Sequence, residues 1–217
     1  MNVSKSIVVY MTSIIVAFFI SATNAASQAS LNFQGEILPD SCDMVIDNGG
    51  TLRLGKRNTQ QSPSDKNSIR LEERNIVINI TCPAATLFAI RPIDIAINAG
   101  NVKPASAEGN RVFSLGQSVS GKAIGGYYAS IDKSRSRVDG RQPDNIILSQ
   151  DQGNSWQVAQ GYLTANGQNV YSWGEQLQPY SARSVKVSLL ISPFLFQNSY
   201  SDAVKIDGAT SFELIYL

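Results

Sequence analysis

An alternation of apolar and polar residues recurs along this chain, and this period of two constrains the fold more than any other feature. The clearest run is Ile76 to Cys82, in which β-branched or apolar residues occupy every second position. Such a run predicts a β-strand with one buried face. Further runs cover residues 31–37, 88–97, 185–191 and 212–216. No stretch sustains a helical stripe, so the sequence predicts an all-β protein.

Turn signals separate these runs. Asn48-Gly49-Gly50, Asp139-Gly140, Asn166-Gly167 and Asp207-Gly208 are each suited to a positive φ or a tight reversal. Many short strands with frequent turns are typical of a β-sandwich.

The amino-terminal residues have the pattern of a secretory leader. Residues 1–5 form a short positive start, residues 7–20 are almost wholly apolar, and small residues follow. A membrane anchor is the competing interpretation, but a spanning helix needs roughly 20 apolar residues. We expect cleavage between Ala25 and Ala26, which leaves residues 26–217 as a single exported domain.

Export decides the expected state of the two cysteines. In an oxidising compartment Cys42 and Cys82 are expected to form one disulfide, whereas the cytosol would keep them as thiols. A redox-active pair is the alternative, but it favours a C-x-x-C spacing, which is absent here.

Charge and composition exclude several classes of function. The 18 Lys and Arg residues nearly balance the 17 Asp and Glu residues, so no electrostatic footprint for nucleic acid is present. The chain contains no histidine, which removes the Ser-His-Asp and Cys-His schemes and histidine-ligated metals. We therefore expect a protein that is not an enzyme and carries no cofactor or metal.

One segment matches the S-x-D-x-G-x-[ST]-W pattern of an Asp box. The matching residues are Ser149, Asp151, Gly153, Ser155 and Trp156. The carboxylate can accept hydrogen bonds from turn amides, the glycine can take a left-handed conformation, and the indole can cover the turn. The motif resembles those of sialidases and other secreted β-proteins, where it stabilises loops away from the catalytic centre. A structural hairpin is the preferred interpretation, with ligand contact as the alternative.

Aromatic residues gather in the central part of the sequence. They are Tyr127, Tyr128, Trp156, Tyr162, Tyr171 and Trp173. Aromatic rings can stack on sugars, but use in the core is commoner in a sandwich. Two carboxylates could form a glycosidase pair without histidine, but nothing in the sequence singles out two of them.

The carboxyl terminus continues a strand pattern to the last residue. Phe212, Leu214 and Tyr216 alternate with other residues, and Leu217 ends the chain. The segment is either a final core strand or an edge that a partner grips by adding a strand of its own.

Taken together, these features resemble subunits of chaperone–usher fimbriae. The resemblance rests on Phe33 to Ile37 ahead of Cys42, on Leu52-Arg53-Leu54-Gly55, on Ile76 to Cys82, and on the aromatic end at Tyr216. A less studied fimbrial-type subgroup is similar in further segments. These are residues 113–116, 121–127, the Asp box and 207–217.

The resemblance implies an immunoglobulin-like sandwich that lacks its last strand. A periplasmic chaperone would pair along Phe212, Leu214 and Tyr216 and anchor the Leu217 carboxylate. The amino-terminal extension of another subunit would then replace the chaperone, and an outer-membrane usher is a further partner that the resemblance implies. In this chain Ala29 and Leu31 are the groove-filling residues of that extension.

The resemblance also implies a function. We expect a structural fimbrial subunit that passes through the periplasm to the cell surface and contributes to adhesion. A sugar-binding tip adhesin with a host glycan as partner is the alternative, and a secreted glycosidase is a third class. The stretch from residue 100 to 173 is longer than a minimal pilin needs, which predicts an insertion with extra hairpins.

Overall fold

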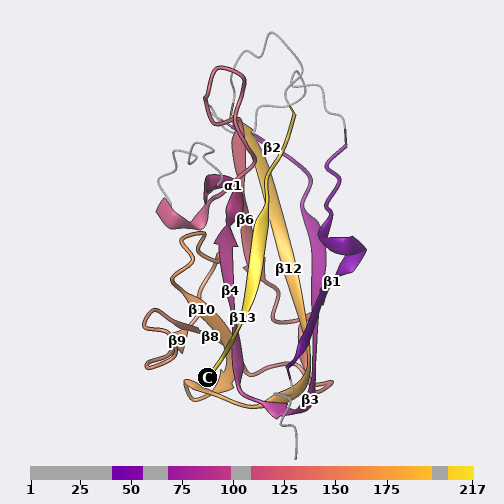
Figure 1. Cartoon of the computed structure of the whole chain (residues 1–217), viewed down its shortest axis with the longest axis vertical. Coiled ribbons are helices and arrows are strands. Elements are labelled where there is room, and N and C mark those ends of the chain that lie inside the picture. Colours follow the sequence, from indigo (N-terminus) through magenta and orange to yellow (C-terminus); the bar gives the residue numbers. More distant parts are fainter. Residues whose placement is uncertain (1–40, 56–67, 99–108, 197–204) are drawn as a thin grey trace, which may run out of the picture. The chain divides into compact units, whose positions relative to one another are not determined.

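The computed structural model describes residues 41–55, 68–98, 109–196 and 205–217. All of them belong to one compact unit, Pro39–Leu217. Their strands form two antiparallel sheets that face each other as a sandwich (Figure 1). The all-β sandwich predicted from the alternation is therefore confirmed.

The first sheet has seven strands, and the long strand β12 lies at its centre. Its spatial order is β1 (Asp43–Ile46), β3 (Arg74–Thr86), β12 (Ala182–Phe196), β6 (Gly125–Ile131) and β5 (Phe113–Ser114), with β2 (Ser68–Arg70) and β7 (Arg137–Val138) also paired to β12. We refer to it as the seven-stranded sheet.

The second sheet has six strands and ends at the carboxyl-terminal strand. Its spatial order is β13 (Thr210–Tyr216), β4 (Phe88–Asp94), β10 (Val170–Glu175), β8 (Asn145–Ser149) and β9 (Gln157–Val158), with β11 (Gln178–Pro179) paired to β10. Figure 1 shows β13 in yellow beside the magenta β4. We refer to it as the six-stranded sheet.

The core lies between the two sheets and is built from the predicted alternating residues. On β3, Ile76, Ile78, Ile80 and Cys82 are all less than a tenth exposed, whereas Thr81 faces solvent. Phe88 of β4 packs edge-on against Trp173 of β10, with ring centroids 4.9 Å apart. Burial of these side chains is the main source of stability in such a fold.

Within the described ranges, three short helical turns interrupt the strands. They are η1 (Asp47–Gly50), α1 (Ile95–Asn98) and η2 (Gly109–Arg111). The strand expected over residues 88–97 ends earlier, at Asp94, and α1 follows it. Asp94 is buried, and its carboxylate accepts a hydrogen bond of 2.6 Å from the amide of Ser114. None of the helices within the described ranges has both the length and the apolar character needed to span a bilayer.

At Asp207-Gly208, where the sequence predicts a turn, the chain packs closely against Ser114 and Leu115. Asp207 donates its amide to the carbonyl of Leu115, and a Cβ added to Gly208 would lie 2.5 Å from the Ser114 carbonyl oxygen. A glycine is required because only a residue without a side chain allows this approach. The contact holds the segment ahead of β13 against the residues around β5.

The segment predicted as an insertion supplies strands to both sheets. Its described part contributes β5 to β10, and β6 and β10 each lie between two neighbours. The remaining part, residues 100–108, lies outside the described residues.

Candidate functional site

The last strand, β13, presents one unpaired edge. It pairs along its full length with β4, and within the described ranges β4 is its sole partner strand. Phe212 and Leu214 turn inward and pack against the core, whereas Glu213 turns outward and meets Arg91 of β4 at 3.3 Å. The ion pair matches the cross-strand register, so the inward and outward faces of β13 are well specified.

The first strand, β1, is the corresponding edge of the other sheet. Within the described part of the chain it pairs with β3 alone. Figure 1 shows β1 in indigo at one border of the seven-stranded sheet. Each of these two strands therefore leaves one edge at which no described strand continues the pairing, and the far borders of the two sheets are formed by β5 and β9.

A groove of about 300 Å³ opens from the interior of the sandwich beside these edges. Its apolar lining comes from the segment after β1, from the inner face of the seven-stranded sheet and from the start of β13. The main apolar members are Ile46, Leu52, Leu54, Ile76, Leu189, Ile191, Ile206 and Phe212. Apolar side chains that face such a groove remain in contact with water unless something fills it.

Two hydroxyl groups in the lining of the groove are satisfied within the protein. The hydroxyl groups of Tyr127 and Thr210 form a hydrogen bond that joins β6 to β13. Burial raises the pKa of Tyr127 well above its usual value. This hydroxyl therefore stays protonated, and it connects the two sheets rather than acting as an acid or base near neutral pH.

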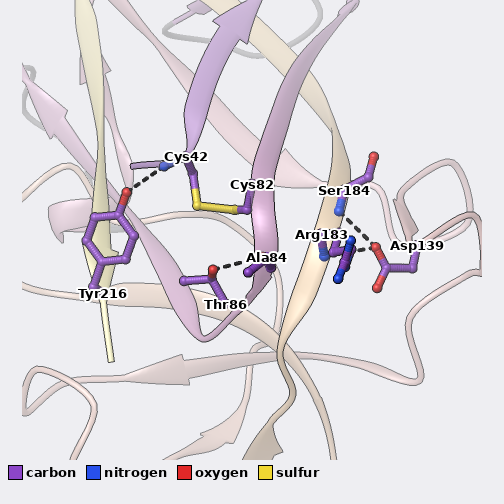
Figure 2. Close-up of a disulfide and its surroundings, with 8 residues drawn as sticks. All are labelled: Cys42, Cys82, Ala84, Thr86, Asp139, Arg183, Ser184 and Tyr216. Atoms are coloured by element: carbon purple, nitrogen blue, oxygen red, sulfur yellow. Dashed lines mark hydrogen bonds between the residues drawn. A yellow bond between two sulfur atoms is a disulfide. The ribbon is translucent and has the colours of Figure 1, made fainter. Parts of the chain in front are cut away.

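The opposite end of β13 is held beside the disulfide. Cys42 and Cys82 are bonded, as predicted, and the amide of Cys42 donates a 2.8 Å hydrogen bond to the Tyr216 hydroxyl (Figure 2). The disulfide joins β3 to the residue just before β1, and the tyrosine joins that residue to the six-stranded sheet. This bridge between the sheets is absent from the sequence prediction, because nothing in the sequence pairs position 42 with position 216.

The four predicted partner-binding residues differ from one another in their surroundings. Phe212 lines the groove, and Leu214 packs against the core beyond it. Tyr216 and Leu217 are 50% and 41% exposed, so these two side chains are accessible to a partner. The backbone of Leu217 is held by a hydrogen bond from its amide to the Leu87 carbonyl.

The Asp box forms the predicted local hairpin network. Asp151 accepts hydrogen bonds from the amide and hydroxyl of Ser155, at 2.9 and 2.6 Å, and from the hydroxyl of Ser149 at 2.7 Å. The indole of Trp156 donates to the carbonyl of Gly153, whose φ is +100°. The hydrogen bond from Ser155, more than any other interaction, lowers the pKa of Asp151 to about 2. The carboxylate is thus committed to the turn.

The Asp box also contacts the carboxyl terminus. A Cβ added to Gly153 would lie 2.8 Å from Cδ2 of Leu217, so the last side chain packs against this glycine. The two segments were identified separately in the sequence, and only the fold brings them together.

The central aromatic residues do not form one cluster. Tyr171 and Trp173 are buried in the core, Tyr127 stacks on Phe113 inside the sandwich, and Trp156 covers its own turn. Tyr128 and Tyr162 instead pack together, with ring centroids 4.5 Å apart. The partner of this pair, Phe194, was not identified from the sequence.

Some predicted residues cannot be placed. The cleavage residues Ala25 and Ala26 and the extension residues Ala29 and Leu31 lie outside the described residues. In the part of the chain that is described, no group of three or more metal-ligating side chains could hold an ion.

Comparisons with known proteins give distant relatives. A family model described as a protein of unknown function, DUF1120, matches residues 31–100, which is less than half of the chain. Protein GltF of Escherichia coli (strain K12) is 26% identical, and the alignment covers 93% of each chain. The uncharacterized protein YhcF of the same strain is 24% identical, over 93% of this chain and 95% of its own. The chain is therefore similar to these proteins over nearly its whole length.

Proposed function

We propose that this chain is a structural subunit of a surface fimbria, completed and polymerised by strands that partner molecules donate. The observation that carries the proposal is the apolar groove of about 300 Å³ beside the unpaired edge of β13. An unpaired edge and an open apolar groove both favour aggregation in water. A single extended segment would remove both liabilities.

The groove suits an extended segment better than a compact ligand. A strand laid along β13 would pair with its free backbone edge, and every second side chain would enter the groove. The lining contributed by Leu52, Leu189 and Phe212 is apolar, so apolar side chains of the donor would be selected. The backbone pairing would provide affinity, and the alternate side chains would provide specificity.

The partners follow from this arrangement. A periplasmic chaperone is proposed as the first donor, an outer-membrane usher as the assembly site, and the amino-terminal extension of another subunit as the final donor. In this chain that extension would present Ala29 and Leu31 to the groove of a neighbour. The finished subunit would stand in a fibre at the cell surface and contribute to adhesion.

The exposed end of β13 supplies the test. We expect removal of Tyr216 and Leu217 to reduce capture by the chaperone by about tenfold or more, because a paired strand end is lost and the terminal carboxylate moves two positions back along β13. Capture is measured by co-purification from the periplasm with the chaperone co-expressed. Val119→Ser is the matched control, because Val119 is fully exposed and lies in a turn between β5 and β6.

Two results would contradict the proposal. One is undiminished capture of the shortened chain with its disulfide intact. The other is a mature chain that accumulates alone as a stable monomer in which every amide of β13 resists hydrogen exchange. The second result would mean that the chain fills its own groove.

A further inference from the structure

A second pocket, of about 230 Å³, lies on the outer face of the seven-stranded sheet. Tyr127 points into the sandwich, where it bonds to Thr210, so the next residue, Tyr128, points outward. The pocket is bounded by Tyr128 of β6, by Ser192 and Phe194 of β12, by residues at and after β2, and by Tyr162. It is separate from the groove beside β13, which opens between the sheets.

One wall of this pocket is aromatic. The ring of Tyr128 lies 4.5 Å from that of Tyr162 and 5.5 Å from that of Phe194, in both cases tilted by less than 40°. Phe194 is 9% exposed and forms the buried part of the wall against Tyr128, whereas Tyr162 is 38% exposed and forms its accessible part. The wall therefore offers a ring surface to a ligand.

The loop that carries Tyr162 is held in place by its neighbour. Leu163 is only 2% exposed, and its amide donates a hydrogen bond to the Ala129 carbonyl of β6. Gly126 permits the packing behind the wall, because a Cβ there would lie 2.4 Å from Val112 and 3.2 Å from Phe194. The aromatic wall is thus positioned before any ligand arrives, which lowers the entropic cost of binding.

Another part of the pocket's lining is polar and carries both signs of charge. Glu73 accepts a 2.6 Å hydrogen bond from the hydroxyl of Ser192, its one hydrogen-bond partner among the described residues. Arg70 lines the same pocket. A carboxylate accepts hydrogen bonds, so Glu73 offers acceptor positions to the hydroxyl groups of a ligand, whereas Arg70 already takes part in an interaction within the protein.

We propose that this pocket binds one pyranose ring of a saccharide. A sugar ring has an apolar face of C–H groups and a rim of hydroxyl groups that both donate and accept hydrogen bonds. The Tyr128–Tyr162 wall complements the face, and the Glu73 carboxylate complements the hydroxyl groups of the rim. The volume lies below the 300–1,000 Å³ typical of sites for drug-sized ligands, which favours a single ring.

Other ligand classes fit less well. The Glu73 carboxylate would repel a phosphate or sulfate beside Arg70. A lipid chain would require a pocket without this carboxylate and guanidinium. The saccharide site does not depend on the proposed fimbrial function, because its residues lie on the outer face of the sheet rather than in the groove.

The test is saturation-transfer NMR on the purified protein. The protein is measured in the state in which it is isolated, either free or bound to its chaperone. The probes are the methyl glycosides of glucose, galactose, mannose, fucose, N-acetylglucosamine and N-acetylneuraminic acid. We expect transfer to at least one probe, and its ring protons should receive the strongest signal. Tyr162→Ala should weaken that affinity by about fivefold or more, whereas Tyr162→Phe keeps the ring and should stay within about twofold of the original protein.

Two further variants locate the site. Glu73→Gln should weaken binding although the aromatic wall and the fold stay unchanged. A loss of affinity in this variant would therefore report a lost contact with the ligand and not a loss of folding. Trp156→Ala is the aromatic control at the Asp box and should leave binding intact. The proposal is overturned if no probe binds, if Tyr162→Ala binds as well as the original protein, or if binding is lost in the Trp156 variant alone.

Discussion

At the scale of single residues, acidic side chains accept backbone hydrogen bonds at points where the chain turns. Asp139, with a φ of +46°, accepts hydrogen bonds of 3.0 and 2.8 Å from the amides of Arg183 and Ser184, where the pairing of β12 is irregular (Figure 2). Asp151 performs the same task within the Asp box. Both aspartates stabilise the local backbone: Oδ1 of Asp139 accepts two amides, and both carboxylate oxygens of Asp151 accept donors from the protein.

The Asp box gives a prediction for acid pH. Because the pKa of Asp151 is lowered from 3.8 to about 2, its carboxylate contributes stability that is fully present above about pH 4. That contribution is lost as the pH falls through about 2, when the folded state takes up the proton. The indole N–H signal of Trp156 in NMR should therefore shift and broaden between pH 4 and pH 2. Asp151→Asn should show the loosened turn already at neutral pH. If the Trp156 signal of this variant still changed between pH 4 and pH 2 as in the original protein, the change could not be assigned to Asp151.

At the scale of elements, β13 is defined by contacts at its two ends. Thr210 bonds to Tyr127 at its start, and Tyr216 bonds to the amide of Cys42 at its end. Between these points Phe212 faces the groove, while Arg91 of β4 fixes the outward face through Glu213. Pairing with β4 therefore holds one edge of the strand in register. No described strand pairs with the other edge.

The Tyr216 hydroxyl gives a prediction at this scale. Tyr216→Phe removes one hydrogen bond between the sheets while keeping the ring, so the stability of the strand end should fall by about 1 kcal/mol. Hydrogen exchange of the Cys42 amide should become about fivefold faster, as expected for an opening energy lowered by this amount. Ser211→Ala, which removes a hydroxyl group from the same strand at its other end, should leave this amide unchanged. Unaltered exchange in the Tyr216 variant would show that the bond does not hold the strand end.

At the scale of the molecule, the disulfide and Tyr216 together hold the beginning of the described chain to its end. The disulfide spans 40 positions and secures β1, a strand of only four residues, to β3. Such a short edge strand has little pairing energy of its own. The covalent bond is therefore important for keeping one border of the groove in place.

Loss of this bond should affect the whole fold. Replacing both Cys42 and Cys82 by serine should lower the free energy of unfolding by about 4 kcal/mol, the loop-closure value for a separation of 40. The measurements are the denaturant midpoint and the yield of protease-resistant protein when the chain is expressed with export to a bacterial periplasm. Equal yield and equal resistance in the double variant would contradict this expectation.

Much of the fold could be predicted because its signals are local. The alternation from Ile76 to Cys82 reports a buried face directly, and the Asp box encodes a turn whose hydrogen bonds join residues at most four positions apart. The disulfide could also be predicted, since a chain with two cysteines has one pairing available and the leader pattern predicts an oxidising compartment.

The sites depend on contacts between distant parts of the chain. No local pattern brings Leu217 to Gly153, Tyr216 to Cys42, or Glu73 to Ser192. The roles of the aromatic residues also could not be predicted from the sequence. The side chains of Tyr127 and Tyr128 point to opposite faces of β6, so that Tyr127 lines the groove and Tyr128 lines the outer pocket. By itself the sequence determined which residues form strands and turns, because period and turn chemistry act over a few positions. Only the tertiary structure decided which strand edges stay unpaired and which side chains meet, because sheet order is set by packing between segments far apart in the chain.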